Sequence, residues 1–347
     1  MEYRFLGETG IQVSRFCLGT MMLGALGNRD SDACVKIIRR ALAAGINFID
    51  TADVYSAGES EELIGKAIAG QRNEVVIATK FGYPAGAGLN ASGGSRRWIL
   101  RAVEASLRRL KTDYIDLYLM HRFDGVTAIE ETQAALSDLV HQGKIRAFGF
   151  SMLSADRIVE SHWLAERCGL LRPRCEQPGY SLFAREAESC VLPACHRYGM
   201  GVMVFSPLDD GWLTGRYRTA ADFAKGGRVV RMASRSAPGG LDNEVMQRKL
   251  ALVRTLSEVA AEAGVSLMHM ALAFTLEHPA VTAAIIGPRT LEHLEDLLAG
   301  AELRLTGELL DRIDALVPPG TNVNPVQFTT GRRGLRHADR RSTPEAI

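Results

Sequence analysis

The chain has 347 residues, a formal net charge of +1 and 46% hydrophobic residues. That length suits either two domains or one long α/β barrel, and the balanced charge gives no reason to expect nucleic acid or an acidic surface as a partner. The first residues show no basic segment followed by an apolar run, and no stretch approaches the ~20 apolar residues of a membrane span. We therefore expect a soluble, cytoplasmic protein without a membrane partner.

The elements predicted along the chain begin with a β-hairpin over residues 3–13 that turns at Glu8–Gly10. Eight short apolar runs then predict strands at residues 16–18, 47–49, 74–79, 113–120, 145–150, 175–177, 201–205 and 282–286. Amphipathic stretches between them predict helices at residues 30–44, 59–70, 96–110, 129–142, 155–167, 185–198, 242–263 and 266–277. Pro193 is expected to interrupt the helix that contains it.

Eight strands that alternate with helices favour a closed parallel (β/α)8 barrel, a TIM barrel, over an open doubly wound sheet. In such a barrel the hairpin would plug the floor, where the strands begin. Two helices precede the last strand, so one of them is extra. We expect one barrel over residues 1–320 and a C-terminal tail over residues 321–347 near the barrel mouth. The long connection at 219–240 is either a loop that folds over a ligand or a segment without fixed structure.

Three successive predicted strands each deliver titratable groups at their C-terminal ends. Asp50 follows the second strand, with Tyr55 five residues later, Lys80 follows the third, and His121 follows the fourth. A lone Lys or His after a strand is usually an ordinary loop residue, but four such groups at three consecutive strand ends are hard to explain in that way. In parallel barrels the chemistry lies at this end, so we predict an active site there.

The sequence around these residues resembles the aldo-keto reductase superfamily. The similar segments, in matching order and spacing, are FIDTADVY, GESEELIG, ATKFG, DYIDLYLMH and GKIRAFGFS, and the resemblance runs from about Tyr3 to about Leu316. It implies reduction of a small-molecule aldehyde or ketone to an alcohol, with hydride from NADPH, which leaves as NADP+. It also implies a catalytic tetrad made of Asp50, Tyr55, Lys80 and His121.

Carbonyl reduction needs a hydride for carbon and a proton for oxygen, and no side chain supplies hydride, so a nicotinamide must. Tyr55 would donate the proton, because a phenol is protonated at neutral pH and a nearby ammonium favours the phenolate. Lys80 would supply that ammonium, with Asp50 holding it as an ion pair. His121 would orient and polarise the carbonyl oxygen.

No Gly-x-Gly-x-x-Gly motif follows a predicted strand, so a Rossmann site is not indicated. The resemblance instead implies a dinucleotide that extends across the barrel mouth. Its implied contacts near the nicotinamide are Gly19, Thr20, Met21, Asp50, Ser151, Gln177 and the stacking ring of Phe205. Those near the pyrophosphate are Ser206, Pro207, Leu208, Gly211, Leu213, Gly215 and Arg216. Those near the adenosine phosphate are Gly287, Arg289, His293 and Asp296, and an arginine at a helix start favours NADPH over NADH.

Several positions depart from the pattern of the family. Met152 stands where an Asn usually follows the strand-five serine, and His293 and Leu297 replace a Gln and an Asn. Asp209 and Asp210 bring two acids into the pyrophosphate loop, where they would repel the ligand unless they point away from it. These changes bear on cofactor affinity and leave the tetrad intact.

Two other functions stay open. One is a regulatory subunit of the same fold that binds the dinucleotide without turning over a carbonyl. The other is a reductase of a nucleotide-sugar ketone or an enone. The six cysteines include no Cys-x-x-Cys pair, so we expect reduced thiols and assign no metal. The physiological substrate and the oligomeric state, with a homo-oligomer among the options, are not fixed by the sequence.

Overall fold

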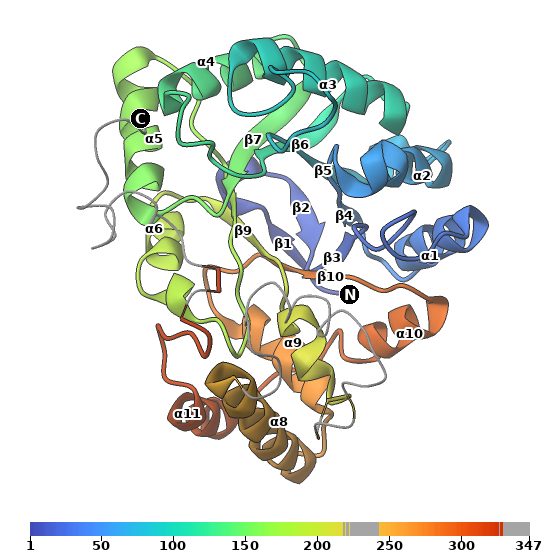
Figure 1. The fold of residues 1–347 in the computed structure, drawn as a ribbon, viewed down its shortest axis with the longest axis vertical. Helices are drawn as coiled ribbons and strands as arrows, with labels where there is room; N and C mark the ends of the chain where they lie inside the picture. Colours follow the sequence, from blue (N-terminus) through green and yellow to red (C-terminus); the bar gives the residue numbers. More distant parts are fainter. Residues whose placement is uncertain (218, 220–221, 223–242, 326, 329–347) are drawn as a thin grey trace.

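The structure is a computed structural model of the chain that describes residues 1–217, 219, 222, 243–325, 327 and 328. Most of the connection predicted at 219–240, and the tail from residue 329 onward, lie outside the described residues. Within the described part, ten helices lie around a central barrel of strands (Figure 1).

Eight parallel strands close into a barrel in the order β10-β3-β4-β5-β6-β7-β8-β9, which confirms the predicted (β/α)8 fold. The strands are β3 (Phe16–Gly19), β4 (Phe48–Asp50), β5 (Val76–Phe81), β6 (Ile115–Met120), β7 (Ile145–Ser151), β8 (Cys175–Gln177), β9 (Gly201–Val204) and β10 (Ala283–Ile286). Their register pairs Gly19 with Asp50 and Ser151 with Gln177. Residues that end neighbouring strands are therefore held at the same level of the barrel mouth.

The helices connect the strands and cover their outer faces. They are α1 (Ser31–Ala43), α2 (Glu59–Ala67), α3 (Arg96–Leu110), α4 (Ile129–His141), α5 (Ala155–Cys168), α6 (Val191–Arg197), α8 (Glu244–Glu262), α9 (Leu267–Glu277), α10 (Leu291–Ala299) and α11 (Gly307–Leu316). Side-chain caps fix several of their starts, because an N-cap oxygen accepts a bond from a free backbone N–H of the first turn. These N-caps include Asp30, Ser95, Asn243, Ser266, Thr290 and Thr306.

The N-terminal hairpin closes the barrel floor. Its strands β1 (Tyr3–Phe5) and β2 (Gln12–Ser14) pair in antiparallel fashion. Leu6 and Val13 are fully buried and belong to the small core inside the barrel, together with Phe48, Leu117 and Met203. A larger core fills the space between the strands and the helices. The barrel wall is therefore packed on both faces, which supports a site built at the strand ends.

One predicted helix differs from the structure. Residues 185–198 form a short 3-10 turn at Glu186–Glu188, followed by α6, which begins at Val191. Pro193 therefore lies in the first turn of α6 instead of interrupting the helix. A proline is tolerated there because backbone N–H groups of the first turn have no acceptor within the helix. The break falls at Cys190, whose φ of −143° is not helical.

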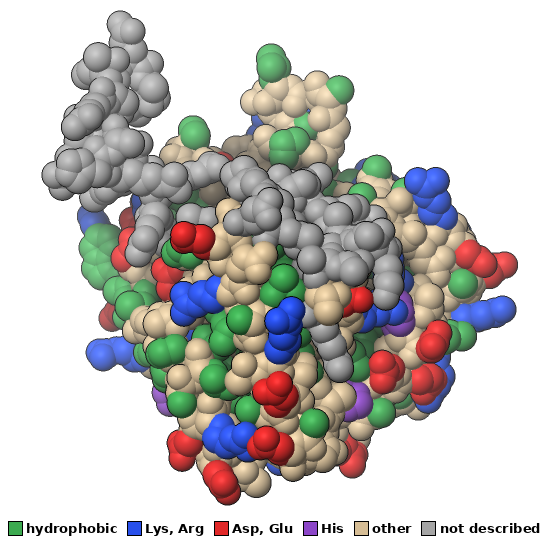
Figure 2. All heavy atoms as spheres, turned by 60° about the horizontal axis from the view of Figure 1, so that its bottom comes forward, with side chains coloured by type: hydrophobic (Ala, Val, Ile, Leu, Met, Phe, Trp, Pro, Cys, Tyr) green, Lys and Arg blue, Asp and Glu red, His purple; other side chains and the backbone are tan. Residues whose placement is uncertain are grey.

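No single helix in the described ranges is long and apolar enough to cross a membrane. Among the described helices, α8 and α9 meet the length and hydropathy criteria only when taken as a pair, and the two are bent by 88° relative to each other. On the face shown in Figure 2, acidic and basic side chains are interspersed, and neither sign gathers into a patch. The six cysteines are all free thiols.

Candidate active site

Polar groups at the C-terminal ends of β4 and β5 form a compact buried cluster. Lys80 Nζ lies 2.7 Å from each carboxylate oxygen of Asp50 and 2.8 Å from the carbonyl oxygen of Thr51. The Tyr55 hydroxyl lies 3.4 Å from the same ammonium, and the Tyr55 ring meets His121 edge-on with centroids 5.7 Å apart. The structure thus brings the four residues of the predicted tetrad together at the barrel mouth.

A short turn after β4 places Tyr55. The loop stays hydrogen-bonded to β5, because Thr51 N–H donates to Ala78 and Asp53 N–H donates to Lys80. Residues Tyr55–Gly58 then form a 3-10 turn in which Ser56 and Ala57 have positive φ values of 50° and 56°. Such conformations cost non-glycine residues about 1–2 kcal/mol each, so the surrounding packing must hold the turn in shape.

The charges in this cluster are fixed by burial and by their neighbours. Burial alone would lower the pKa of Lys80, but Asp50 and Tyr55 outweigh it and hold that pKa above its usual value. Burial, Lys80 and Arg122 together lower the pKa of His121 to about 2. The site therefore contains an ammonium and a neutral imidazole at physiological pH.

The predicted carboxamide contacts are tied directly to the tetrad. Gln177 Nε2 donates to Asp50 Oδ1 at 2.8 Å, and Ser151 Oγ donates to the backbone carbonyl of Gln177 at 2.9 Å. Met152 follows with a φ of 60°, a conformation that Asn adopts more readily than Met. The Met152 sulfur accepts a bond from the Gly179 N–H at 3.4 Å.

The predicted stacking residue, Phe205, follows β9 and is half-buried at the mouth. Its ring meets Phe328 edge-on with centroids 5.0 Å apart, and the Arg122 guanidinium lies 5.8 Å from its centroid. Residues from three distant parts of the chain therefore meet around this ring.

The predicted pyrophosphate loop after β9 is sharply bent. Ser206, Asp209 and Asp210 have φ values between 48° and 58°, and Gly211 and Gly215 also have positive φ. Leu213 is fully buried, Pro207 is buried, Leu208 is half-buried, and Arg216 is exposed. The loop is thus anchored by buried apolar residues and presents an exposed arginine to solvent.

Asp209 does not present a free carboxylate to the loop. It is fully buried and accepts from Lys249 Nζ at 2.5 Å and from Gln327 Nε2 at 2.6 Å. Burial raises the pKa of Asp209, and the Lys249 ammonium opposes that shift. The expected repulsion of a pyrophosphate by two acids is therefore reduced to that of Asp210 alone.

The predicted adenosine-phosphate residues gather where α10 begins. The Thr290 side chain caps α10 by accepting from the His293 N–H, and Asn28 donates to the Arg289 carbonyl. Burial lowers the pKa of His293, and Arg216 and Arg289 lower it further, so both guanidinium groups lie near this ring. Gly287 is exposed, with open space beside it. Asp296 lies in the second turn of α10 and is also exposed. A helix start with two arginines suits an anion.

The remaining predicted cofactor contacts are residues at the C-terminal end of β3, beside the tetrad. Gly19 is buried, and a Cβ there would meet Ile285 at 2.6 Å, so a larger residue would displace the neighbouring strand β10 or its side chain. The Thr20 hydroxyl donates to the Asp50 carbonyl at 3.1 Å and accepts from Ser60. Met21 is half-buried at the mouth.

Several residues of this region were not named individually from the sequence, although the loops at 82–95 and 122–127 were expected to line the substrate site. Tyr83 lies against His121 with ring centroids 4.5 Å apart, and Arg122 bonds Ser151 Oγ at 3.4 Å. Arg122 directly follows His121 in the sequence, and this proximity to a predicted catalytic residue could have identified it. Lys249 and Gln327 lie 40 and 118 residues from Asp209, and no local pattern connects them.

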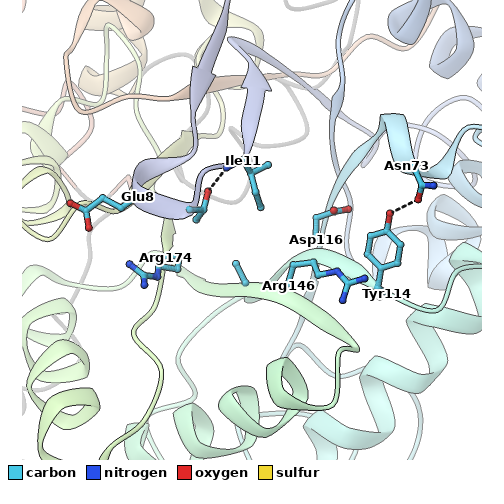
Figure 3. Close-up of a pocket in the computed structure, with 9 residues that line it drawn as sticks. Glu8, Ile11, Asn73, Tyr114, Asp116, Arg146 and Arg174 are labelled. Carbon is cyan, nitrogen blue, oxygen red and sulfur yellow. Dashed lines mark hydrogen bonds between the residues drawn. The ribbon is translucent and has the colours of Figure 1, made fainter.

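A cleft of about 590 Å³ lies at the opposite end of the barrel, between the hairpin and the starts of β6 and β7 (Figure 3). Several of its polar groups are engaged with neighbouring side chains. Asp116 pairs with Arg72 at 2.7 Å, and the Tyr114 ring lies between the guanidinium groups of Arg72 and Arg146, at 3.9 and 4.3 Å. The Tyr114 hydroxyl donates to Asn73. We read this cleft as part of the closed floor.

In the described ranges, no group of three or more His, Cys, Asp or Glu side chains is arranged to hold a metal ion.

Comparison with known proteins agrees with this geometry. The model of the Aldo/keto reductase family matches residues 15–318. The chain is similar to "Uncharacterized oxidoreductase YrpG" of Bacillus subtilis (strain 168), with 37% identity over 92% of this chain and 97% of the relative. It is also similar to "Probable voltage-gated potassium channel subunit beta" of Oryza sativa subsp. japonica, with 34% identity over 91% and 97%. The family model covers nearly the whole chain, and the site residues lie together at the barrel mouth. The chain therefore belongs to the aldo/keto reductase family of oxidoreductases, which generally bind NAD(P)H.

Proposed function

We propose that the chain reduces an aldehyde or a ketone to an alcohol with NADPH as the hydride donor. The observation that carries this proposal is the Tyr55 hydroxyl 3.4 Å from the Lys80 ammonium, which is itself buried and paired with Asp50. A proton donor beside a fixed positive charge, at the mouth of a barrel, is what carbonyl reduction requires of a protein.

The residues along the mouth fit a nicotinamide dinucleotide phosphate. Phe205 offers a half-buried ring at the mouth, where Arg122 lies against it and also bonds Ser151. At the far end, Arg216, Arg289 and the start of α10 offer positive charge and free N–H groups for phosphates. The bound nicotinamide would supply the hydride, and the chain would hold it and the carbonyl together at the mouth.

The tetrad residues would then handle the proton and the charge. Tyr55 donates its hydroxyl proton to the carbonyl oxygen, and the Lys80 ammonium stabilises the phenolate that remains. Asp50 keeps Lys80 charged and in place. His121 is neutral, and its Nδ1 is buried without a partner in the described part of the chain. A ring protonated on Nε2 has one N–H left to bind and orient the carbonyl oxygen.

The experiment that tests this proposal is a turnover assay with a panel of aldehydes and ketones, followed by the absorbance of the reduced nicotinamide. We expect turnover with NADPH for at least one class of carbonyl and slower turnover with NADH. The panel includes an enone and a nucleotide-sugar ketone, which tests the narrower alternative. Absence of turnover with every member would contradict the proposal.

A second function is favoured by the relatives that are named as potassium channel β subunits. In that case the chain binds NADPH as a regulatory subunit, and the bound dinucleotide is a signal. Tight NADPH binding, measured by quenching of protein fluorescence, together with no turnover in the panel, would select this function. Turnover at an ordinary enzymatic rate would select the reductase.

A further inference from the structure

A second polar cluster lies behind the tetrad, between β5, β6 and the helices α2 and α3. Glu61 is fully buried; its Oε1 accepts from Thr79 at 2.6 Å and its Oε2 accepts from Arg109 Nε at 2.7 Å. Asp53 is 5% exposed, and neither of its carboxyl oxygens has a hydrogen-bond partner in the described part of the chain. The Tyr118 hydroxyl is buried near Asp53 and also has no hydrogen-bond partner in the described part of the chain.

The charges in this cluster do not balance if both acids are ionised. The groups that act on Asp53 are Glu61 from α2, Arg109 from α3, Lys80 from β5 and Tyr118 from β6. Arg109 is paired with Glu61, and Lys80 is paired with Asp50. An ionised Asp53 would therefore be a buried carboxylate without a counter-charge of its own, which is costly. Burial first, and then Glu61, raise the pKa of Asp53 to about 7, against the opposing effects of Arg109, the Val54 backbone N–H and Lys80.

This cluster borders both ends of the turn that carries Tyr55. Asp53 precedes Tyr55 by two residues, and its backbone N–H donates to the Lys80 carbonyl at 3.1 Å, which fixes the place of its carboxyl beside the turn. At the other end of the turn, Arg109 packs so closely that a Cβ on Gly58 would meet its Cδ at 2.6 Å. A shift of Asp53 or of Arg109 therefore moves the turn, whose positive-φ residues Ser56 and Ala57 depend on such packing.

We propose that Asp53 is a positioning residue for Tyr55: its neutral carboxyl packs behind the turn, and its ionisation displaces the turn and slows proton transfer. The displacement arises because the new charge is repelled by Glu61 and draws Arg109 away from its present contacts. An extra negative charge near Lys80 also weakens the ability of that ammonium to stabilise the phenolate. This inference rests on the proposed function, in which Tyr55 donates the proton.

The test compares the pH profiles of kcat for NADPH-dependent carbonyl reduction in the wild type and in Asp53→Asn. We expect the wild-type kcat to fall by about fivefold or more as the pH rises from 6 to 8, around the pKa of Asp53. Asp53→Asn should keep a flat kcat over that interval, because its amide does not ionise. Asp116→Asn, which removes an acid from the barrel floor, is the matched control and should keep the wild-type profile.

Asp53→Ser is the second variant and should flatten the profile in the same way if Asp53→Asn does not fold. An unchanged fall of kcat in a folded Asp53 variant, with the wild-type midpoint, would overturn the positioning role and leave the proposed reductase intact. A wild type without turnover at any pH would overturn the reductase proposal and, with it, this role. The two failures are therefore distinguishable.

Discussion

Lys80 is the residue on which the site depends, because it is a fully buried amine whose contacts all serve the mouth. Its ammonium touches both oxygens of Asp50, the Thr51 carbonyl and the Tyr55 hydroxyl. A buried ion pair of this kind adds little stability, because its desolvation offsets the attraction between the charges. Its value is a fixed positive charge beside a phenol, which solvent cannot screen.

Tyr55→Phe should lower kcat for carbonyl reduction by about 10²–10⁴-fold, because the general acid is removed and its ring is kept. The dissociation constant of NADPH should change little, since the proposed cofactor contacts lie elsewhere along the mouth. Steady-state kinetics and fluorescence titration with NADPH measure the two quantities. A variant with wild-type kcat would remove Tyr55 from the acid role.

Arg289→Ala should raise the dissociation constant of NADPH by roughly 10-fold or more, since hydrogen bonds to charged groups contribute ~1.5–3 kcal/mol. Binding of NADH should weaken much less, because NADH lacks the 2′-phosphate that Arg289 is proposed to contact. Arg312→Ala on α11 serves as a control that removes an arginine paired with Glu262, outside the proposed site. Equal losses for both cofactors in Arg289→Ala would show that Arg289 does not read the phosphate.

At the scale of elements, the extra helix α8 supports the loop after β9. Lys249 on α8 reaches Asp209 in that loop and Gln327 after α11, so one ammonium joins three segments. All three side chains are partly or fully buried, and Gln327 also donates to Asp209, so each side chain bonds the other two. The helix that a minimal barrel does not need thus holds the proposed pyrophosphate loop in its bent shape.

Lys249→Met should destabilise the protein by about 3–5 kcal/mol, because it leaves Asp209 as an uncompensated buried charge. The double variant Asp209→Asn with Lys249→Met should recover much of that loss, since no buried charge is left. Thermal or denaturant unfolding of the two single variants and the double variant gives the coupling energy between the residues. Additive losses would mean that the ion pair does not operate as described.

Elements with strong periodicity were predictable, and contacts between distant segments were not. The helix at Arg96–Leu110 agrees with its prediction at both ends because Ser95 caps it and its apolar residues recur at helical spacing. The same reasoning placed Asp50, Lys80 and His121 at strand ends. Helix α11 was not predicted, although Thr306, Leu309 and Ile313 give it a cap and a buried face. The pairing of Lys249 with Asp209 follows only from tertiary packing, which no local pattern records.

For the whole molecule, the buried acids make stability depend on pH. A carboxyl whose folded-state pKa lies above its unfolded value binds more protons in the folded state, so the protein loses stability as the pH rises between those two values. Asp53 has a folded pKa of about 7 against an ordinary value of 3.8. The penalty therefore grows from about pH 4, is complete above about pH 7, and reaches up to ~4 kcal/mol for a shift of this size.

Asp53→Asn should therefore gain stability relative to the wild type as the pH rises from 4 to 8. The amide carries a constant cost at every pH, so the difference in melting temperature between the two proteins, and not its absolute sign at one pH, is the quantity to follow. Thermal unfolding at intervals of one pH unit measures it, with Asp116→Asn as the control, because that acid is paired with Arg72. A difference that stays constant across this range would mean that Asp53 ionises normally in the folded protein. Because unfolding requires no substrate, this measurement reports on the buried cluster independently of any catalytic assay.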